Sequence, residues 1–169
     1  LLFSLILLTT FSGINALADT PHFVDFKYIL NNSVAGKQAQ TALQKKLNNG
    51  IKKLQAKESK IQSEEQEIIN QKKLISAEEY RNKVTELRKK VTLLQKEREI
   101  LLNDVGKKRA KARSELLKNL NPLIKEYMQE KKIRMVIDKK SILLADEKLD
   151  VTQEIIELLN KKLKSIKLD

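Results

Sequence analysis

The sequence predicts an α+β protein in which a small β body carries a long antiparallel coiled-coil hairpin of α-helices, inserted between its first and second strands. Three observations lead to this prediction. The 169 residues include only four Gly and two Pro, so little interrupts a helix. Apolar residues recur at heptad spacing through the middle of the chain, and short strand-like segments stand near both ends. We expect the β body and a terminal helix in residues 19–32 and 132–169, and the hairpin, called the arm below, in residues 33–131 with its tip near residues 70–80.

The first 18 residues, LLFSLILLTTFSGINALA, have the pattern of a cleaved signal peptide. Ala16 and Ala18 form the small-residue cleavage motif, which places the mature start at Asp19. The strongly apolar part covers about 11 residues, whereas a membrane anchor, the alternative, needs about 20. We therefore predict export. Because the chain opens on Leu1 and has no basic segment before its apolar part, we also expect further residues before it in the precursor.

A strand predicted at residues 22–26 is followed by Gly36 and Lys37, which raises the possibility of a phosphate-binding loop. A Walker loop requires G-x-x-x-x-G-K-[ST]. Here Asn31 stands where the first glycine belongs, and Gln38 replaces the hydroxyl residue. We therefore expect no nucleotide site, and predict that Gly36 allows close approach where the first long helix leaves the β body.

The first long helix is predicted to begin after Ser33, an N-cap residue, and to run to about Leu74. Its apolar seam positions are seven residues apart: Leu54, Ile61, Ile68 and Ile75. The alternate seam positions are mostly charged: Ile51, Glu58, Glu65 and Lys72. Charges at these positions weaken a coiled coil, so we expect a flexible arm.

The second long helix is predicted to start near Ala77, because Ser76 and Glu79 form a capping box. Its seam alternates spacings of four and three through Tyr80, Val84, Leu87, Val91, Leu94, Arg98, Leu101, Val105, Lys108 and Ala112, and continues with Leu116, Leu120, Leu123 and Tyr127. Pro122 removes one helical hydrogen bond, which predicts a kink there or a break just before it. Helices of 40 residues are about 60 Å long, whereas a compact chain of this size has a radius of gyration of about 15 Å. The two helices must therefore project from the β body as an antiparallel hairpin.

Two further short strands are predicted at Ile133–Ile137 and Ile142–Ala145, joined by a turn at residues 138–141. Asp150 or Thr152 then caps a terminal helix, whose apolar face is Ile155, Ile156, Leu158 and Leu159. Three short strands leave exposed edges and little buried area. We therefore expect an obligate oligomer that pools its strands around a core of Phe23, Val24, Phe26, Ile133, Met135, Val136, Ile137, Ile142, Leu143 and Leu144.

The charge balance is strongly basic, with 34 Lys and Arg against 22 Asp and Glu and a net charge of +12, which implies an acidic partner. The densest basic run is KKRAKAR, with Lys107, Lys108, Arg109, Lys111 and Arg113. This run is either a solvated helix face or a contact for an anionic client segment, for lipopolysaccharide phosphates or for an anionic membrane surface. Nucleic acid would also fit the charge, but predicted export and the lack of interleaved aromatic residues argue against it.

No group of residues in the sequence suggests an enzyme. There is no Cys, and His22 is the only histidine, so neither thiol chemistry nor a metal site is expected. The acidic pairs lie on heptad helices, where they form solvated faces, and Asp25 and Asp138 fit turn and cap positions. We predict no catalytic residues, no cofactor and no metal.

The order of these features resembles the Skp/OmpH-like family of periplasmic chaperones. The resemblance rests on FVDFKYILNNSVAGKQAQTAL near the start and RMVIDKKSILLADEKLDVTQEIIELLN near the end, on either side of a hairpin of suitable length. It implies a homotrimer shaped like a jellyfish, with three arms around a cavity. It also implies an ATP-independent holdase that keeps unfolded outer-membrane β-barrel proteins from aggregating in the periplasm. This chain has few aromatic residues, so client contacts would rely more on charge and aliphatic surface.

Two other classes of function remain open. A structural coiled-coil adaptor or spacer of the cell envelope would use the same heptads as a rod, although charged seam positions argue mildly against rigidity. A nucleic-acid compactor would require residues 1–18 to stay on a cytoplasmic protein.

Overall fold

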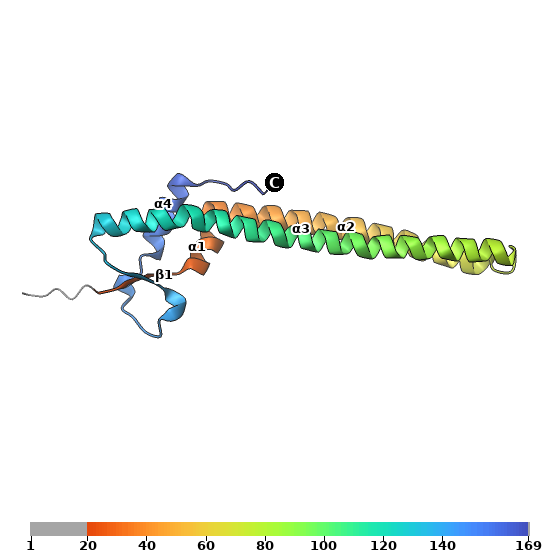
Figure 1. The fold of residues 1–169 in the computed structure, drawn as a ribbon, viewed down its shortest axis with the longest axis horizontal. Coiled ribbons are helices and arrows are strands. Elements are labelled where there is room, and N and C mark those ends of the chain that lie inside the picture. The colour runs from red at the N-terminus through yellow and green to blue at the C-terminus, as the bar shows by residue number, and fades with distance from the viewer. Residues whose placement is uncertain (1–19, 169) are drawn as a thin grey trace, which may run out of the picture.

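The computed structural model describes residues 20–168, which form a small body from which two long helices project side by side (Figure 1). The elements in chain order are β1 (His22–Val24), α1 (Phe26–Asn32), α2 (Val34–Gln71), α3 (Ala77–Lys131), β2 (Val136–Asp138), the short 3-10 helices η1 (Lys139–Ser141) and η2 (Glu147–Leu149), and α4 (Thr152–Lys162). The predicted signal peptide, residues 1–18, lies outside the described residues.

The sheet joins the two ends of the described chain. β1 and β2 pair in parallel, with Phe23 opposite Ile137. Phe23 also forms a parallel bridge with Asp150, and the Val151 N–H donates to the Phe23 carbonyl over 3.0 Å. The prediction that the helical hairpin is inserted between the first strand and a partner more than 100 residues downstream is confirmed, as is the α+β class.

The predicted third strand, Ile142–Ala145, is wrong for the described chain, whose sheet has two strands. The Asp138 carboxylate accepts a hydrogen bond from the Lys140 N–H over 3.2 Å and starts η1, which turns the chain away from the sheet. Residues 142–146 then run as a loop, in which Leu143 is 95% and Leu144 90% exposed. A continuous apolar run, Ile142–Ala145, was thus mistaken for a strand, although no neighbouring strand pairs with it in the described chain.

The other two strands are shorter than predicted. Asp25 ends β1 because its carboxylate accepts the Tyr28 N–H over 2.8 Å and caps α1, so that Phe26 is helical instead of extended. At the other end of the arm, Lys132 adopts φ 56° and terminates α3. The chain becomes a strand only at Val136, three residues later than predicted.

The caps of the two long helices were correctly predicted, but some helix ends were not. The predicted cap of the terminal helix, Asp150 or Thr152, is wrong, because Val151 occupies the N-cap position of α4 and no side chain caps that helix. Ser33 accepts the Gly36 N–H over 3.2 Å, and Ser76 accepts the Glu79 N–H over 3.1 Å. α2 ends at Gln71, three residues before the predicted end. α3 continues through Pro122, so no helix break occurs there. Buried side chains on both sides of the proline hold this part of α3 against the body: Leu116, Leu120, Leu123, Ile124 and Tyr127.

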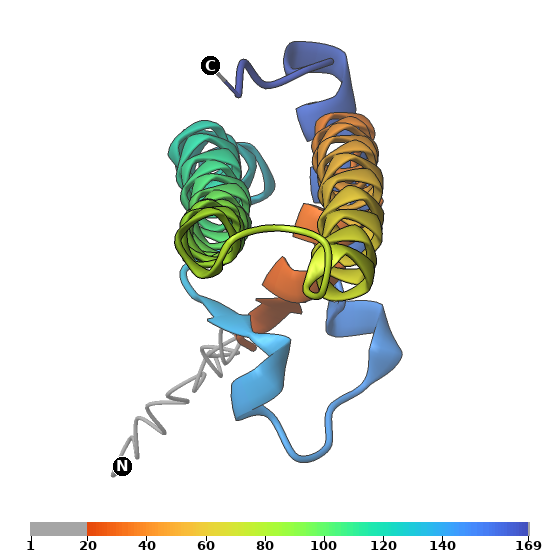
Figure 2. The same cartoon turned by 90° about the vertical axis from the view of Figure 1, so that its right-hand side faces the viewer.

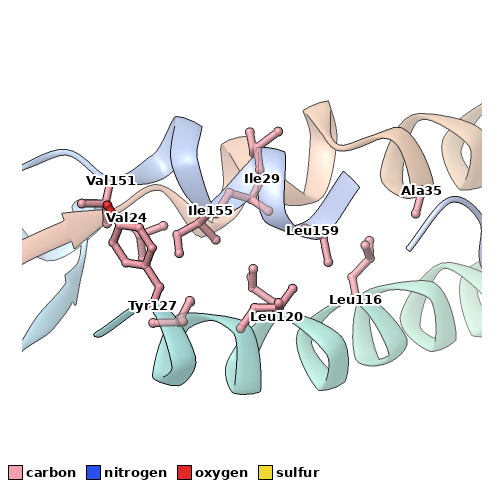
Figure 3. Close-up of a cluster of buried hydrophobic side chains, with 12 residues drawn as sticks. Val24, Ile29, Ala35, Leu116, Leu120, Tyr127, Val151, Ile155 and Leu159 are labelled. Atoms are coloured by element: carbon pink, nitrogen blue, oxygen red, sulfur yellow. The ribbon is translucent and has the colours of Figure 1, made fainter. Parts of the chain in front are cut away.

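The body packs on the part of α3 that extends past α2. α3 has 55 residues and α2 has 38, so the overhang of 17 residues is about 25 Å long. Val24, Ile29, Leu120, Ile155 and Leu159 are all fully buried there, and they join β1, α1, α3 and α4 in one core (Figure 3). The segment after α4 lies on one side of the helix pair and residues 136–150 lie on the other (Figures 1 and 2).

The seam between α2 and α3 is tightest near the body and looser toward the tip. Leu54, Leu94 and Val105 are buried, whereas Val91 is 40% exposed. The remaining predicted seam residues are half-buried: Ile61, Ile68, Ile75, Tyr80, Val84, Leu87 and Leu101. Ion pairs cross from one helix to the other along the arm, at Lys46–Asp104, Lys57–Glu97, Glu58–Arg98 and Glu64–Lys90.

Candidate functional site

A groove of about 930 Å³ opens at the base of the arm, where α2 and α3 leave the body. Its floor is largely apolar and includes Leu30, Leu43, Leu47, Val105, Ala112 and Leu116. Its lining also includes five basic side chains: Lys27, Arg109, Arg113, Lys139 and Lys140. We call this feature the base groove. Its volume is near the upper end of the range of about 300–1,000 Å³ that is usual for ligand pockets.

Close packing between α1 and α2 forms one wall of the base groove. A Cβ atom on Gly36 would lie 2.0 Å from the Leu30 carbonyl oxygen, so no other residue fits between the two helices at this distance. The predicted role of Gly36 in close approach is confirmed. The Val34 N–H donates to the Asn160 side-chain oxygen over 2.7 Å, which ties the start of α2 to α4.

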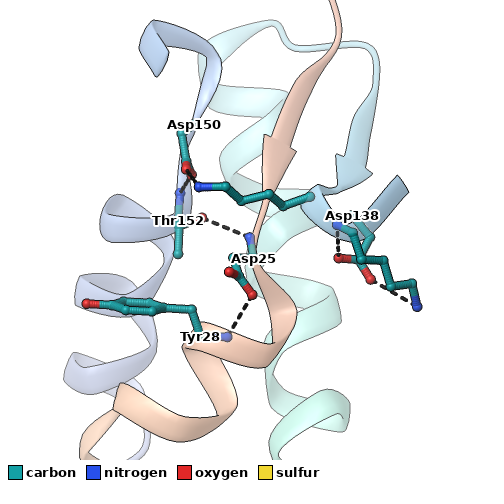
Figure 4. Close-up of polar contacts among 7 residues, drawn as sticks. Asp25, Tyr28, Asp138, Asp150 and Thr152 are labelled. Carbon is teal, nitrogen blue, oxygen red and sulfur yellow. Dashed lines mark hydrogen bonds and ion pairs between the residues drawn. The ribbon is translucent and has the colours of Figure 1, made fainter. Parts of the chain in front are cut away.

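Figure 4 shows a polar network around Asp25, Asp138, Asp150 and Thr152. This network holds Lys139 and Lys140, which line the base groove. Lys139 Nζ lies 3.0 Å from an Asp150 oxygen, and the Thr152 N–H donates to the other Asp150 oxygen over 2.9 Å. The Asp25 N–H donates to the Thr152 hydroxyl over 2.8 Å. Asp25 caps α1 and Asp138 starts η1, as the predicted cap and turn roles require. Segments that are more than 100 residues apart are thereby fixed to one another.

The charges in this network stabilise each other. Partial burial acts to raise the pKa of Asp150, but the hydrogen bonds from Thr152 and the contact with Lys139 outweigh it and leave the pKa below its ordinary value. The hydrogen bond to Asp150, assisted by the charge of that carboxylate, raises the pKa of Lys139. Lys139 Nζ also lies 5.5 Å from the centroid of the Phe23 ring, in cation–π range.

The fold separates the predicted basic run onto different sides of α3. Arg109 and Arg113, four residues apart, line the base groove. Lys108 is directed elsewhere, because its Nζ donates to the Leu168 carbonyl over 2.6 Å, in the segment after α4. Lys107 and Lys111 are exposed and do not line the groove. Two of the five candidate residues therefore share a concave surface.

The predicted oligomer core is only partly buried in the single chain. Phe23 and Val24 are buried, and the half-buried members are Phe26, Ile133, Val136, Ile137 and Ile142. Met135 is 55% exposed, and Leu143 and Leu144 are almost fully exposed. That these side chains meet between subunits remains a prediction.

Sequence reasoning missed three basic residues of the base groove: Lys27, Lys139 and Lys140. They come from α1 and from η1, at opposite ends of the chain. The only sequence signal for them was the predicted pairing of the first and second strands, which brings these two ends together. The reasoning also missed α1, whose seven residues follow the capping residue Asp25.

Residues 20–168 contain no group of three or more His, Cys, Asp or Glu side chains arranged to hold a metal ion. None of the helices in this part of the chain is both long enough and apolar enough to cross a membrane.

Comparisons with known proteins agree with the geometry. The model of the family described as outer membrane protein (OmpH-like) matches residues 22–159. The fold is similar to the crystal structure of a candidate outer membrane chaperone (OmpH-like) from Caulobacter crescentus, with a TM-score of 0.82 and 19% sequence identity. The similarity covers 89% of this chain and 90% of that chain. None of the curated proteins matches the chain.

Proposed function

From the premise that the chain belongs to the OmpH-like family of outer membrane proteins, we propose that it is a periplasmic holdase chaperone. It binds unfolded outer-membrane β-barrel proteins without ATP and prevents their aggregation. Three chains associate through their β bodies, and clients occupy the space between the three arms. The N-terminal segment directs the chain to the periplasm and is then removed.

The observation that carries this proposal is the arm itself. α2 and the part of α3 that pairs with it are each about 57 Å long, and they project from a body that packs on the remaining 17 residues of α3. The arm exposes aliphatic side chains that no other part of the described chain covers: Ile51, Ile69, Leu93, Ile100 and Leu102. Scattered aliphatic contacts on a basic surface suit weak, multiple binding of an unfolded chain better than binding of one folded partner.

The exposed side chains of the β body support association of subunits. Leu143, Leu144 and Met135 form apolar surface that a single chain leaves in water, and surfaces of this kind usually mark contacts between proteins. The two-stranded sheet also leaves the outer edge of β2 without a neighbouring strand in the described chain, whereas the outer edge of β1 is partly covered by the bridge to Asp150. Both features would be buried by pooling the bodies of several chains.

The net charge of +12 supports an electrostatic share of binding. Basic arms attract acidic clients and repel one another, which keeps the space between them open. Lipopolysaccharide or another anionic membrane surface would be attracted by the same field. Added salt shortens the range of these forces, so client capture should weaken as ionic strength rises.

The test is a light-scattering mass measurement on residues 19–169, alone and after a urea-unfolded outer-membrane barrel protein is diluted into the sample. A trimer that takes up one client and keeps it soluble supports the proposal. A basic globular protein of similar mass is the control for charge alone. A monomer, or a dimeric rod that leaves the client to precipitate, contradicts it.

A structural adaptor or spacer of the cell envelope is the second candidate. One observation favours it. The charged seam residue Glu58 lies opposite Arg98 and forms an ion pair with it, so its charge weakens the coiled coil less than the sequence suggested. An adaptor would act as a fixed rod. It would show no client uptake, and its scattering profile would remain that of a single extended shape.

A further inference from the structure

We propose that the base groove binds an extended client segment in which apolar residues alternate with acidic ones. This inference rests on the proposed holdase function and assigns one of its contacts to a defined surface. The shape, the lining and the charge of the groove each argue for this occupant.

The shape of the base groove suits an extended chain. Along α3 the lining runs from Val105 to Leu116, which is about 16 Å of helix. At about 3.3 Å per residue this length takes about five residues of extended polypeptide. The apolar floor would contact alternate side chains of such a segment, and the remaining side chains would face the basic rim.

The rim of the base groove carries positive charge that the acidic residues of the described chain neutralise only in part. Of its basic residues, Lys139 pairs with Asp150 and Lys140 with Asp138. Lys27, Arg109 and Arg113 have no ion-pair partner within residues 20–168. Asp25 and Asp138 are the acidic lining residues, and both carboxylates already accept backbone hydrogen bonds. The groove is therefore complementary to carboxylates, and arginine can bind these with two parallel hydrogen bonds.

Two exposed aliphatic side chains lie on the same side of α3 toward the tip, with Gln95 and Arg98 between them on that face. Leu102 lies seven residues before Arg109, and Val91 lies eleven residues before Leu102, spacings that bring residues to one helix face. Leu102 is 56% and Val91 40% exposed. A chain that leaves the groove would meet further apolar contacts, which favours a long polypeptide over a compact ligand.

Client strands have the required pattern. Strands of membrane-spanning β-barrels alternate residues that face lipid with residues that face a polar interior. An unfolded segment of this kind, with Asp or Glu among its polar residues, would place its apolar side on the floor and its carboxylates at Arg109 and Arg113.

The first test measures peptide binding to the assembled full chain. The probes are ten-residue peptides in which Val alternates with Glu or with Lys. We expect the Glu peptide to bind at least tenfold more tightly than the Lys peptide, and R109Q/R113Q to weaken the Glu peptide at least tenfold. The matched control, K107Q/K118Q, removes the same charge from α3 outside the groove, and should change the affinity less than twofold. Equal losses in the two variants would overturn the proposal, because binding would then depend only on net charge.

The second test uses the absence of Cys from the sequence, so that a single introduced thiol carries a photo-crosslinker. Gln44 lines the base groove, whereas Ala42 is exposed at the same depth on the opposite face of α2. We expect Q44C to crosslink an unfolded barrel protein, and A42C to give at least fivefold less product. Equal yields, or a Q44C crosslink between subunits without client, which would place a second copy in the groove, would overturn the proposal.

The two levels of the proposal can fail separately. A wild-type chain that keeps barrel protein soluble, with no loss of peptide binding in R109Q/R113Q, overturns the groove assignment alone. If the Glu peptide binds the wild-type chain and crosslinks to Q44C, but the chain keeps no barrel protein soluble, the holdase function is overturned. The groove then remains a peptide site.

Discussion

Glu58 of α2 and Arg98 of α3 face each other across the seam of the arm, with a carboxylate oxygen and a guanidinium nitrogen 3.6 Å apart. Both residues occupy heptad positions that an ordinary coiled coil fills with apolar side chains. Because the pair is partly exposed, its contribution to stability is small, about 0.2–1 kcal/mol. The pair thus helps to align α2 with α3 but contributes little to the stability of the arm.

Replacing the pair with leucine should stiffen the arm. In E58L/R98L, two apolar side chains would meet at the seam and add about 1–2 kcal/mol of local stability, which slows amide exchange about 5- to 30-fold. Hydrogen exchange of the arm amides measures this directly.

The single variant E58L is the control for the leucine pair, because it leaves Arg98 without its carboxylate and should gain less. Unchanged exchange in the double variant would show that the charged pair does not limit arm stability. A slower exchange with the same range of accepted clients would show that the flexibility of the arm does not set that range.

Two glycines should respond in opposite directions to alanine. A Cβ at Gly36 would approach the Leu30 carbonyl oxygen to 2.0 Å, whereas a Cβ at Gly106 meets no atom within 4 Å. G36A should therefore destabilise the body by more than 1 kcal/mol, through a forced shift of α1 against α2. G106A should stabilise α3 by up to about 1 kcal/mol, because alanine is the better helix former. Urea unfolding of both variants tests this, and a stabilising G36A would contradict the packing described here.

Ionisation of Asp150 should make the body less stable to unfolding at acid pH. Its pKa is lower in the folded chain than the ordinary value of 3.8, so its contribution is fully present above pH 3.8 and is lost as the pH falls through the folded pKa. Lys139 has a raised pKa, and its contribution is lost only in strong alkali, as the pH rises above 10.5. Urea unfolding of the wild type and D150N between pH 2.5 and 7 measures the acid part.

We expect D150N to be less stable than the wild type at pH 7, and the difference to shrink as the pH falls below 3.8. D146N is the control, because Asp146 is exposed and caps only η2. A constant difference between wild type and D150N over the whole pH range would exclude ionisation of Asp150 as the cause.

Shortening the arm by one heptad in each helix should lower the size of the largest client. Residues 62–68 and 86–92 lie opposite each other, as the Glu64–Lys90 ion pair shows. Their joint deletion removes about 10 Å of arm and keeps the seam in register. We expect the body to unfold at the same urea concentration, small barrel proteins to remain soluble and larger ones to precipitate. Deletion of 62–68 alone breaks the register and serves as the control. An unchanged size limit would contradict binding between the arms.

The local parts of the fold were predictable and the tertiary parts less so. Ser33 and Ser76 were correctly identified as caps, because a cap depends on residues three positions apart. The strand predicted at Ile142–Ala145 failed because whether an apolar run becomes a strand depends on a neighbouring strand, which sequence patterns do not supply.

The candidate site shows the same division. Arg109 and Arg113 stood out as part of a dense basic run, but helical geometry alone could not say which of the five basic residues face the body. The fold makes that choice: Lys108 contacts the Leu168 carbonyl in the segment after α4, whereas the two arginines line the base groove together with Lys139 and Lys140.

The pairing of β1 with β2 constrains the order in which parts of the chain can fold. The two strands are separated in sequence by the whole arm. Closing so long a loop in a disordered chain is entropically costly and slow. Contacts between α2 and α3 nearest the tip are local in sequence and can form early, and they draw the two ends of the hairpin together. Pairing of the two arm helices would thus bring Phe23 close to Ile137 and allow the sheet to form before the chain binds any client.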